Sequence, residues 1–411
     1  MKDAVLTINA GSSSIKFALF DASLARIAIG ATDKIGVAPH FTAYDAGGTL
    51  LVERAWEHGA AITHETLLAP MLDWITHHLG EATLLAAGHR IVHGGRDFIA
   101  PMRLDDASLR SLAALTPLAP LHQPHNLAAI RSVMALRAGL PQIGCFDTAF
   151  HHGMPDVATR MALPRHFADE GLRRYGFHGL SYEFIAGRLR ALAPEEAAGR
   201  IIAAHLGNGA SLCAMRNGLS IDTTMGLTAL DGLVMGTRCG AIDPGAILYL
   251  MQTHRMDAEA VTHLLYEKSG LLGLSGLSAD MQVLEASDRP EAAEAVASFV
   301  YRAAREIGAL TSSLGGLDGL IFTAGIGEHA ASVRAAICAR LGWLGVEIDP
   351  AANERHAAII STTGSRVVVR VIPTNEEEMI ARHCLDVMGV NAADTHSQSS
   401  NAERVPHPLG M

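Results

Sequence analysis

Lysine is rare in this chain of 411 residues, occurring only at positions 2, 16, 34 and 268. The formal net charge is -10, because 42 acidic side chains outnumber 32 basic ones. Binding to DNA or RNA depends first on many lysine and arginine contacts with phosphates, so a broad nucleic-acid surface is excluded. An anionic ligand must instead be held by a few well-placed basic side chains.

Cysteine is equally sparse, with five residues that lie more than twenty positions apart and form no C-x-x-C pair. This spacing supports neither a disulfide framework nor a structural zinc site. Long apolar runs are missing too, because Asp3, Asn9 and Lys16 interrupt the first twenty residues, which argues against a signal peptide or a membrane span. We therefore expect a soluble, cytoplasmic protein.

The common nucleotide and hydrolase motifs are absent. None of the four lysines follows a glycine, which excludes the P-loop G-x-x-x-x-G-K-[ST]. Gly207-x-Gly209 and Gly325-x-Gly327 lack the third glycine of the dinucleotide fingerprint, and G-x-S-x-G does not occur. The 21 histidines include no H-E-x-x-H, so scattered structural histidines explain them better than a metal site.

What is present indicates an α/β protein of two domains, since 411 residues with 49% hydrophobic content exceed the usual size of one core. Short strands are predicted at 4–9, 15–20, 26–30, 84–87, 143–146, 201–204, 320–323 and 367–372. The clearest helix begins near Asp288 and ends at Gly315-Gly316. Residues 391–411 lack periodicity and are predicted to be a disordered tail.

One internal similarity bears on the architecture. Residues 5–20 and 201–216 share the same layout, an apolar strand, a glycine turn with small polar groups and a second strand, about 196 positions apart. This layout indicates a duplicated fold in which each half begins with a phosphate-holding turn. The alternative is that any two β-hairpins look alike at this level, and the pattern alone leaves both open.

Five polar or glycine-rich groups of residues follow apolar strands, where open α/β sheets place their ligands. They comprise NAGSSSIK (9–16), GHRIVHGG (88–95), FDTAFHH (146–152) with RYGFHG (174–179), HLGNGAS (205–211) with GIGEH (325–329), and MGTRCGAID (235–243) with PTNEEE (373–378). We expect the glycine turns to bring backbone N–H groups to phosphates and the arginines to grip anions bidentately.

Each group also has an ordinary structural interpretation. The first could be a serine-rich turn, although Lys16 would add charge at a phosphate and Asn9 could hold a metal-bound water. Arg90 could belong to a buried ion pair, and Asp147 could be a structural hydrogen-bonding group. The run from Glu376 could be the acidic first turn of a helix, which the helix dipole favours, or its first member could bind Mg²⁺ through water.

These segments, in this order, resemble the acetate kinase family, the acetate/propionate kinase branch of the actin, sugar kinase and Hsp70 superfamily. The resemblance rests on INAGSSSIK, HRIVHGG, FDTAFH, YGFHG, HLGNG, MGTR, GIGE and PTNEE and runs from residue 5 to about 390. It implies a two-domain actin-like ATPase with duplicated, ribonuclease H-like βββαβαβα cores and an interdomain active-site cleft. The implied domains are 1–149 completed by a C-terminal helix 378–390, and 150–377.

The resemblance implies a role for each matching residue. The catalytic positions are Arg90, Asp147, His178 and Arg238, and the substrate-binding positions are Arg90, Val92, Leu121 and Phe177. The nucleotide-binding positions are Lys16, His205, Leu206, Gly207, Asn208, Gly209, Asp280, Met281, Gln282, Gly325, Ile326, Gly327, Glu328 and His329. The metal-binding positions are Asn9 and Glu376.

The implied reaction is reversible, Mg²⁺-dependent phosphoryl transfer from ATP to acetate, giving acetyl phosphate and ADP. Mn²⁺ is a possible substitute metal, and the implied assembly is a homodimer with no nucleic-acid or membrane partner. Valine at position 92 goes with acetate, whereas alanine there makes room for propionate. The alternatives are a propionate or butyrate kinase of the same family and a non-catalytic actin-like nucleotide-binding protein.

The chain departs from the family pattern at several positions. Gln282 stands where the family has an arginine beside the adenine, and His329 stands where it commonly has asparagine. Cys239 and Ala241 replace a frequent serine and aspartate. These departures put nucleotide affinity or choice in doubt but leave the residues at the transferring phosphoryl group unchanged.

Overall fold

The chain divides into two compact units in the computed structural model, which describes residues 3–11, 14–57, 64–80 and 82–390. Among the described residues, those of 3–94, 100–146 and 376–390 belong to the first unit, and 95–99 and 147–375 to the second. The chain thus passes between units at 146/147 and 375/376, where we had expected 149/150 and 377/378, and 95–99 pack with the second unit. The predicted disordered tail 391–411 lies outside the described residues.

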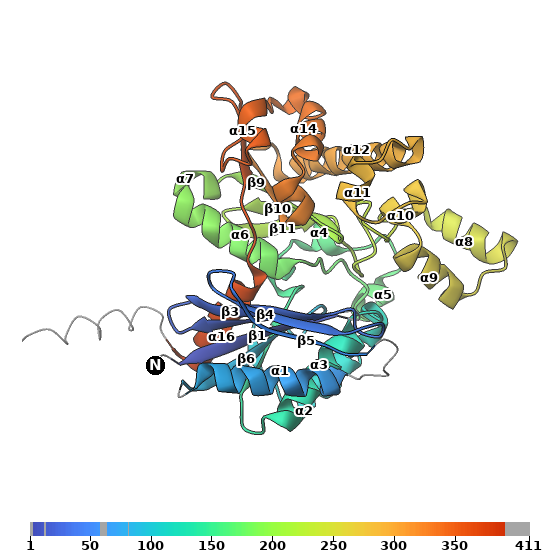
Figure 1. Ribbon diagram of the computed structural model, residues 1–411. Helices are drawn as coiled ribbons and strands as arrows, with labels where there is room; N and C mark the ends of the chain where they lie inside the picture. The colour runs from blue at the N-terminus through green and yellow to red at the C-terminus, as the bar shows by residue number, and fades with distance from the viewer. Residues whose placement is uncertain (1–2, 12–13, 58–63, 81, 391–411) are drawn as a thin grey trace, which may run out of the picture. The chain divides into compact units, whose positions relative to one another are not determined.

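The first unit is built on an eight-stranded sheet with the order β5-β4-β3-β2-β1-β6-β8-β7. Its elements are β1 (Ala4–Ala10), β2 (Ile15–Asp21), β3 (Arg26–Asp33), β4 (His40–Asp45), β5 (Leu50–Ala55), α1 (His64–Leu79), β6 (Leu84–Ile91), β7 (Met102–Arg103), α2 (Asp106–Ala113), η1 (Thr116–Leu118), α3 (Gln123–Leu136), β8 (Gln142–Phe146) and α16 (Glu376–Met388). Strand β5 forms one edge, and most of its side chains are exposed (Figure 1).

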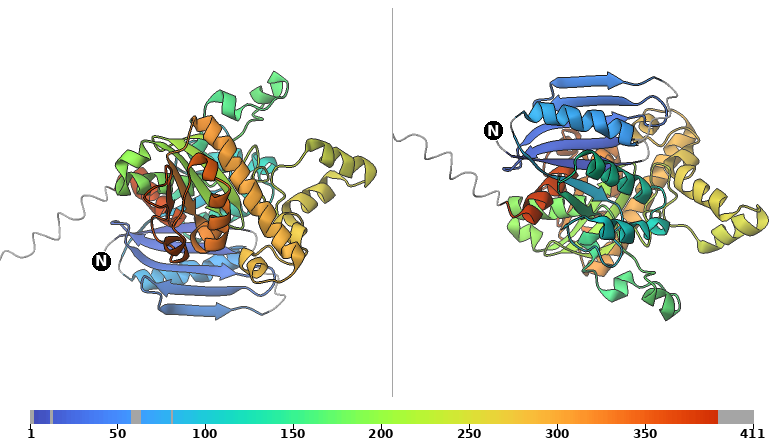
Figure 2. Two further views of the ribbon diagram at one scale, coloured as in Figure 1. Left: turned by 90° about the horizontal axis from the view of Figure 1, so that it is seen from above. Right: turned by 90° about the horizontal axis from the view of Figure 1, so that it is seen from below.

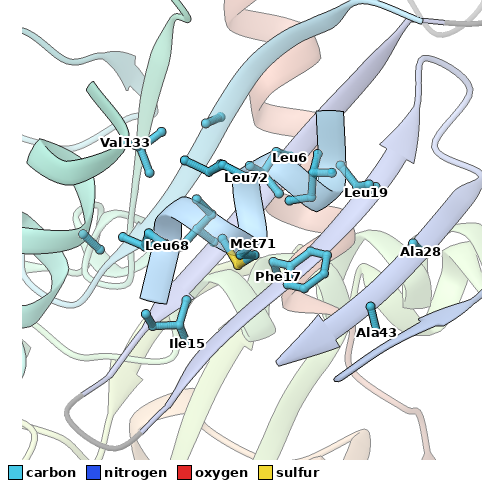
Figure 3. Close-up of a cluster of buried hydrophobic side chains, with 14 of the residues drawn as sticks. Leu6, Ile15, Phe17, Leu19, Ala28, Ala43, Leu68, Met71, Leu72 and Val133 are labelled. Atoms are coloured by element: carbon cyan, nitrogen blue, oxygen red, sulfur yellow. The ribbon is translucent and has the colours of Figure 1, made fainter. Parts of the chain in front are cut away.

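The core of the first unit forms where α1 packs on the sheet. Phe17 and Leu19 of β2 lie on one face of the sheet and pack in one cluster with Leu68, Met71 and Leu72 of α1 (Figure 3). These side chains are at most 1% exposed, and burying each contributes about 1.5–3 kcal/mol. The face of α1 that carries them repeats at three and four residues, as helix geometry requires.

Helix α16 packs on β6 and β1 of the same sheet (Figure 1). It comes so close to β6 that a Cβ atom at Gly88 would lie 2.4 Å from Cys384 Sγ and 2.5 Å from Ile380 Cγ2. Glycine at position 88 is therefore a packing requirement. This contact brings Glu376, the first residue of α16, towards Arg90 near the end of β6.

The second unit contains a five-stranded sheet with the order β11-β10-β9-β12-β13. Its elements are η2 (Ala149–His151), α4 (Asp156–Thr159), α5 (Arg165–Asp169), α6 (Gly179–Leu192), α7 (Pro194–Ala197), β9 (Arg200–Leu206), β10 (Ala210–Arg216), β11 (Leu219–Thr223), α8 (Pro244–Thr253), α9 (Ala258–Glu267), α10 (Gly270–Ser275), α11 (Met281–Glu285), α12 (Pro290–Leu314), β12 (Gly319–Thr323), α13 (Ala324–His329), α14 (Ala331–Ala339), η3 (Gly342–Leu344), α15 (Pro350–Glu354) and β13 (Val368–Val371).

Helix α12 packs along β9, β10 and β11, and α6 packs against β9 (Figure 2). Tyr182, Ile185 and Leu189 of α6 join Ile201 and Cys213 of the sheet in one buried cluster. The long helix predicted from Asp288 is α12, and it ends as expected at Gly315, which adopts a φ of 71°. This cluster holds α6, which carries the candidate site residues at its N-terminus, against the sheet.

The duplication predicted from sequence is confirmed by the strand order. The run β3-β2-β1-β6-β8 in the first sheet matches β11-β10-β9-β12-β13 in the second. In both runs the first two pairings are antiparallel and the last two parallel. Strands β1 and β9 begin at residues 4 and 200, an offset of 196 positions.

Two expectations about local structure need correction. Strands β4 and β5 were not predicted, because β5 is mostly exposed and β4 buries only Phe41 and Ala43, which is too short a hydrophobic signal. The segment GIGEH was expected to be a glycine-rich turn before a helix, whereas residues Ala324–His329 are themselves the helix α13. No helix in the described part of the chain is both long and apolar enough to cross a membrane.

Candidate active site

A polar cluster forms in the first unit where β1, β2 and β6 carry their polar residues. Asn9 lies opposite Lys16 in the β1–β2 pairing, so both side chains are on one face of the sheet. Arg90 Nη1 donates to Asn9 Oδ1 over 3.4 Å, and Arg90 Nε lies 3.6 Å from Glu376 Oε2. The structure therefore joins four predicted residues that come from three distant segments.

The electrostatics of this cluster centre on Glu376, whose side chain is only 16% exposed. Burial raises the pKa of this carboxyl, repulsion from Glu377 adds to the rise, and the positive charges of Arg90 and Lys16 oppose it. The run from Glu376 also forms the first turn of α16, as the helix interpretation predicted. The helix interpretation of the acidic run is therefore confirmed, whereas binding of Mg²⁺ by its first member, Glu376, stays a prediction.

The donor set of the cluster suits a hard divalent cation. Asn9 offers an amide oxygen and Glu376 a carboxylate, the oxygen ligands that Mg²⁺ prefers. Two protein ligands are enough for Mg²⁺, which usually keeps several waters and takes further oxygens from substrate phosphates. Among the described residues no group of three or more His, Cys, Asp and Glu side chains could hold a metal, so a dense all-protein site is not present there.

Val92 and Leu121 lie in the same unit. Val92 is 5% exposed and its backbone N–H donates to Asn126 Oδ1 at 3.1 Å. Asn126 Nδ2 in turn donates to the carbonyl of Ala10 at 2.6 Å, so this amide ties the end of β1 to the segment after β6. Leu121 is half-buried just before α3. Sequence reasoning missed Asn126, because a buried asparagine in a helix carries no motif.

In the second unit, the N-terminus of α6 organises the site. The N–H of Gly179 donates to the carbonyl of Asp147 at 2.9 Å, and a Cβ atom at 179 would lie 2.2 Å from that oxygen. His178 precedes the helix with a φ of 58°, the left-handed conformation that non-glycine residues adopt mainly at functional or strained positions. Asp147 and Phe177 are both buried beside it.

Two parallel hydrogen-bond chains orient the histidines of this site. His178 Nδ1 pairs with Ser211 Oγ at 2.8 Å, and Ser211 Oγ pairs with Tyr182 OH at 2.6 Å. His205 Nδ1 pairs with Ser181 Oγ at 2.8 Å. The two imidazole rings stack with centroids 4.1 Å apart and 17° between their planes. Ser211 holds His178 through Nδ1 and so fixes the direction in which Nε2 points.

The second chain continues beyond Ser181, whose Oγ pairs with Thr374 Oγ1 at 2.8 Å. Ser211 belongs to the HLGNGAS segment, so its polar turn was noticed, but its role could not be read from the sequence. Ser181 and Tyr182 carried no signal, since a contact between a helix and a distant segment has no local pattern. Thr374 belongs to the PTNEEE segment, but its pairing with Ser181 could not be predicted.

Arg238 approaches the same place from the MGTR loop. A Cβ atom at Gly209 would lie 3.2 Å from His178 Nε2 and 3.5 Å from Arg238 Nη2, so both nitrogens lie around the glycine. Arg238 Nη1 donates to the carbonyl of Ala229 at 2.8 Å, which fixes the guanidinium. A guanidinium, an imidazole and an open glycine turn together form a small anion-binding arrangement.

The predicted nucleotide segments of the second unit line one cavity of about 430 Å³. Its lining includes Gly207, Asn208, Asp280, Met281, Gln282, Gly325, Ile326 and His329. A cavity of this size falls within the range of small-molecule sites. Asp280 caps α11 by accepting from the N–H of Gln282 at 2.9 Å. His205 and Leu206 are buried in β9, which leads to the cavity.

Glu328 differs from the other predicted nucleotide residues. Its Oε1 accepts from the N–H of Ala324 at 2.8 Å and from the N–H of Thr374 at 3.1 Å. This carboxylate therefore clamps α13 to the segment after β13. Arg334, fully buried, donates to the carbonyls of Gly327 and Glu328 and holds the other end of α13. The sequence did not point to Arg334, because it lies in a helix outside any motif and an arginine there is typical of an exposed position.

Comparison with known proteins agrees with this geometry. The model of the Acetokinase family matches residues 4–382. The chain is 50% identical over 391 residues to an acetate kinase of Rhodopseudomonas palustris, covering 93% of this chain and 98% of that protein. It is also 50% identical over 403 residues to an acetate kinase of Methylocella silvestris, covering 96% and 100%.

Two solved structures show the same fold. A propionate kinase from Francisella tularensis subsp. tularensis SCHU S4 superposes with a TM-score of 0.87 at 34% identity, covering 93% of this chain and 98% of that one. Porphyromonas gingivalis acetate kinase gives a TM-score of 0.82 at 33% identity, covering 94% and 100%. The predicted actin-like α/β fold class is thereby confirmed. With half of its residues identical to acetate kinases over nearly its full length, this chain belongs to the acetokinase family.

Proposed function

We propose that this protein is an acetate kinase, which transfers the terminal phosphoryl group of ATP to acetate and forms acetyl phosphate and ADP reversibly. The observation that carries the proposal is the arrangement of His178 Nε2 and Arg238 Nη2 around Gly209. Two positively polarised donors at an open turn suit a phosphoryl group that gathers charge on its equatorial oxygens. The proposed roles are stabilisation of that charge by Arg238 and His178.

The acceptor needs no strong general base. Acetate has a pKa well below 7, so it arrives ionised, and the protein's task is to hold two anions in line and neutralise their charge. We assign the gripping of the carboxylate to Arg90 and the packing of the acyl methyl group to Val92, Leu121 and Phe177. Asp147 is assigned a positioning role, supported by its burial and its backbone contact with Gly179.

The proposed nucleotide site is the cavity of the second unit whose lining includes Gly207, Asn208, residues 279–282, Gly325, Ile326 and His329. In the first unit, Lys16 is the proposed nucleotide-binding residue. Asn9 and Glu376 are the proposed ligands of Mg²⁺, with Mn²⁺ as a substitute. The bound cation would neutralise phosphate charge. Within the chain, Arg90 orients Asn9 and Glu376 by its contacts with both side chains. We further propose a cytoplasmic homodimer.

Propionate is the second candidate acceptor, since a propionate kinase is among the similar structures. The relatives compared at 50% identity are acetate kinases, and valine at position 92 is the residue that goes with acetate in the family. One extra methylene changes discrimination by only about 1–3 kcal/mol, so propionate should react more slowly without being excluded.

The test is to incubate the purified protein with ATP, Mg²⁺ and acetate, propionate or butyrate, and to trap acyl phosphate as the hydroxamate. We expect acyl phosphate to form from acetate with the highest kcat/KM, and from propionate and butyrate more slowly. The Arg238→Ala variant serves as the control, with turnover lowered by orders of magnitude and an unchanged thermal unfolding midpoint. A higher kcat/KM for propionate would reassign the acceptor. Binding of ATP without any acyl phosphate would favour a non-catalytic nucleotide-binding protein.

A further inference from the structure

A second cavity of about 750 Å³ lies in the second unit, lined by the 232–241 loop, the 268–274 segment, α12 and Arg340. It shares no lining residue with the proposed nucleotide cavity. The residues around it include Gly270, Gly273 and Ala241, whose small side chains leave its interior open. The reaction proposed above uses none of the residues that line this cavity.

The charge of the lining is unusual for this acidic chain. Three cationic side chains, Lys268, Arg302 and Arg340, line the cavity together with one carboxylate, Glu294. Lys268 is one of only four lysines in the chain. Within the described residues no side-chain hydrogen bond or ion pair occupies Lys268 or Arg302. Cations that are not paired within the protein can pair with an anionic ligand without first breaking a bond.

Arg340 is held at the wall in a different way. Its guanidinium carbon lies 5.4 Å from the centroid of the Tyr301 ring, and both residues line the cavity. Stacking on the tyrosine ring orders the guanidinium. Its N–H groups lie in the guanidinium plane, where they can donate to an acceptor. The cavity therefore combines one cation ordered by stacking, Arg340, with Lys268 and Arg302.

Two departures from the family pattern fall in this lining. Cys239 and Ala241 stand where the family frequently has serine and aspartate, and both line the cavity. An aspartate at 241 would add a second carboxylate to the wall and neutralise one of the three cations. Its replacement by alanine leaves the cavity more positive in this chain. Burial also raises the pKa of the Cys239 thiol, so this side chain adds no negative charge.

The walls of the cavity are joined to the loop that carries Arg238. The N–H of Ser269 donates to the carbonyl of Thr237 at 3.0 Å, and the N–H of Leu271 donates to the carbonyl of Met235 at 2.8 Å. The N–H of Cys239 donates to the carbonyl of Leu265 at 3.1 Å. A ligand that fixed the 268–274 segment would therefore restrict the backbone on both sides of Arg238.

We propose that this cavity binds a compact organic dianion, a phosphate monoester or a dicarboxylate, and that binding changes turnover by stabilising the loop of Arg238. The binding step stands independently of the proposed function, while the change in turnover rests on it. Two or three charge-assisted hydrogen bonds suffice to hold such a ligand, since they are the strongest hydrogen bonds that side chains form.

The binding test uses the full chain in titration calorimetry with 3-phosphoglycerate, succinate and, as a neutral control, glycerol. The variants are Arg302→Gln, which removes a cation, and Ala241→Asp, which restores the carboxylate. Arg305→Gln is the matched control, because Arg305 lies on the same helix but pairs with Glu306 outside the lining. We expect saturable binding of at least one dianion, weakened about tenfold or more in both cavity variants but unchanged in Arg305→Gln.

If 3-phosphoglycerate binds more tightly than succinate, the ligand class is a phosphate monoester, and if succinate binds more tightly, it is a dicarboxylate. Absence of saturable binding by either probe would overturn the proposal, and so would equal weakening by Arg305→Gln, which would mean non-specific attraction. If MgADP displaced the bound dianion and Ala241→Asp bound the dianion as tightly as the wild type, the dianion would be bound in the nucleotide cavity, and the proposal would be overturned. For the second step, kcat is measured with and without the bound dianion in the wild type and in Arg302→Gln. A dianion that binds but leaves the wild-type kcat unchanged contradicts the coupling to Arg238.

Discussion

Arg90 Nε lies 3.6 Å from Glu376 Oε2, which joins the middle of the first unit's sheet to the first residue of the last helix. The contact arises because α16 packs on β6 at Gly88, two positions before Arg90. It places a largely buried carboxylate beside a guanidinium and the amide of Asn9. The proposed metal site therefore takes Asn9 from the N-terminal part of the chain and Glu376 from its C-terminal part.

Replacing Glu376 by glutamine should weaken the binding of Mg²⁺. The amide keeps the size of the side chain but removes the charge that a hard cation prefers, so the apparent Mg²⁺ activation constant should rise about 10–100-fold. The measurement is initial velocity as a function of free Mg²⁺ at saturating ATP. Glu378→Gln is the matched control, since Glu378 lies in the same turn and contacts Arg382. Equal effects of the two variants would argue against a metal role for Glu376.

Removing the hydroxyl of Ser211 should lower turnover without an equal effect on substrate binding. Ser211→Ala frees His178 Nδ1 from its 2.8 Å partner, so the imidazole loses its fixed orientation. We expect kcat to fall about tenfold, with a smaller fall for Tyr182→Phe, and KM nearly unchanged.

The double variant of Ser211 and Tyr182 distinguishes a shared chain from two separate effects. Because both hydroxyls belong to one network, its loss should be smaller than the sum of the single losses in free energy. Ser313→Ala, which removes an exposed hydrogen bond to Asp222, is the control and should leave kcat unchanged. Strict additivity would show that Tyr182 does not act through Ser211.

A methyl group at position 209 should block the proposed anion site. In Gly209→Ala the Cβ atom would lie 3.2 Å from His178 Nε2 and 3.5 Å from Arg238 Nη2. Displacing either group should lower kcat about 10²-fold while the unfolding midpoint stays nearly constant. Gly187→Ala is the matched control: its Cβ meets nothing within 4 Å, and it lies inside α6. That control should keep full activity and gain about 1 kcal/mol of stability.

Enlarging the acyl pocket should shift acceptor preference. Val92 is 5% exposed, and Val92→Ala removes two methyl groups from the proposed pocket. The ratio of kcat/KM for propionate to that for acetate should rise about 10–100-fold. Taking the ratio within one variant cancels any general loss of folded enzyme. An unchanged ratio would remove Val92 from the pocket.

Two buried histidines should make the protein less stable in acid. Burial lowers the pKa of His89 and of His151 from 6.5 to about 4. Because the unfolded chain takes up protons first, each histidine's contribution is present above pH 6.5 and is lost progressively as pH falls to about 4. The loss is on the order of 3 kcal/mol for each histidine.

The measurement is the free energy of unfolding in urea between pH 7.5 and 4.5. His89→Gln, which can still pair with Gln142 across the sheet, should make the dependence on pH shallower. His77→Gln, at an exposed position of α1, should leave the slope as it is. A slope that His89→Gln does not alter would mean that His89 is not neutral in the folded state.

Local signals in the sequence determined much of this protein. Alternating apolar residues gave the inner strands of both sheets, Pro290 and Gly315 bounded α12, and the matching segments 5–20 and 201–216 revealed the duplication. Motif residues such as Asn9, Arg90, His178 and Arg238 were identifiable because glycines and polar side chains interrupt apolar strands there. These features depend on residues close together in the chain, where sequence patterns are readable.

Only the tertiary structure decided which distant residues touch. Nothing local predicts that Ser211 holds His178, that Asn126 joins β1 to the segment after β6, or that Arg334 fastens α13. Strands β4 and β5 escaped prediction for a related reason, since β4 depends on pairing with β3, and β5 on pairing with β4. The sequence by itself determined which chemical groups are available. Packing of helices on the two sheets decided how those groups are oriented, because hydrogen bonds between distant segments form only when the chain is folded.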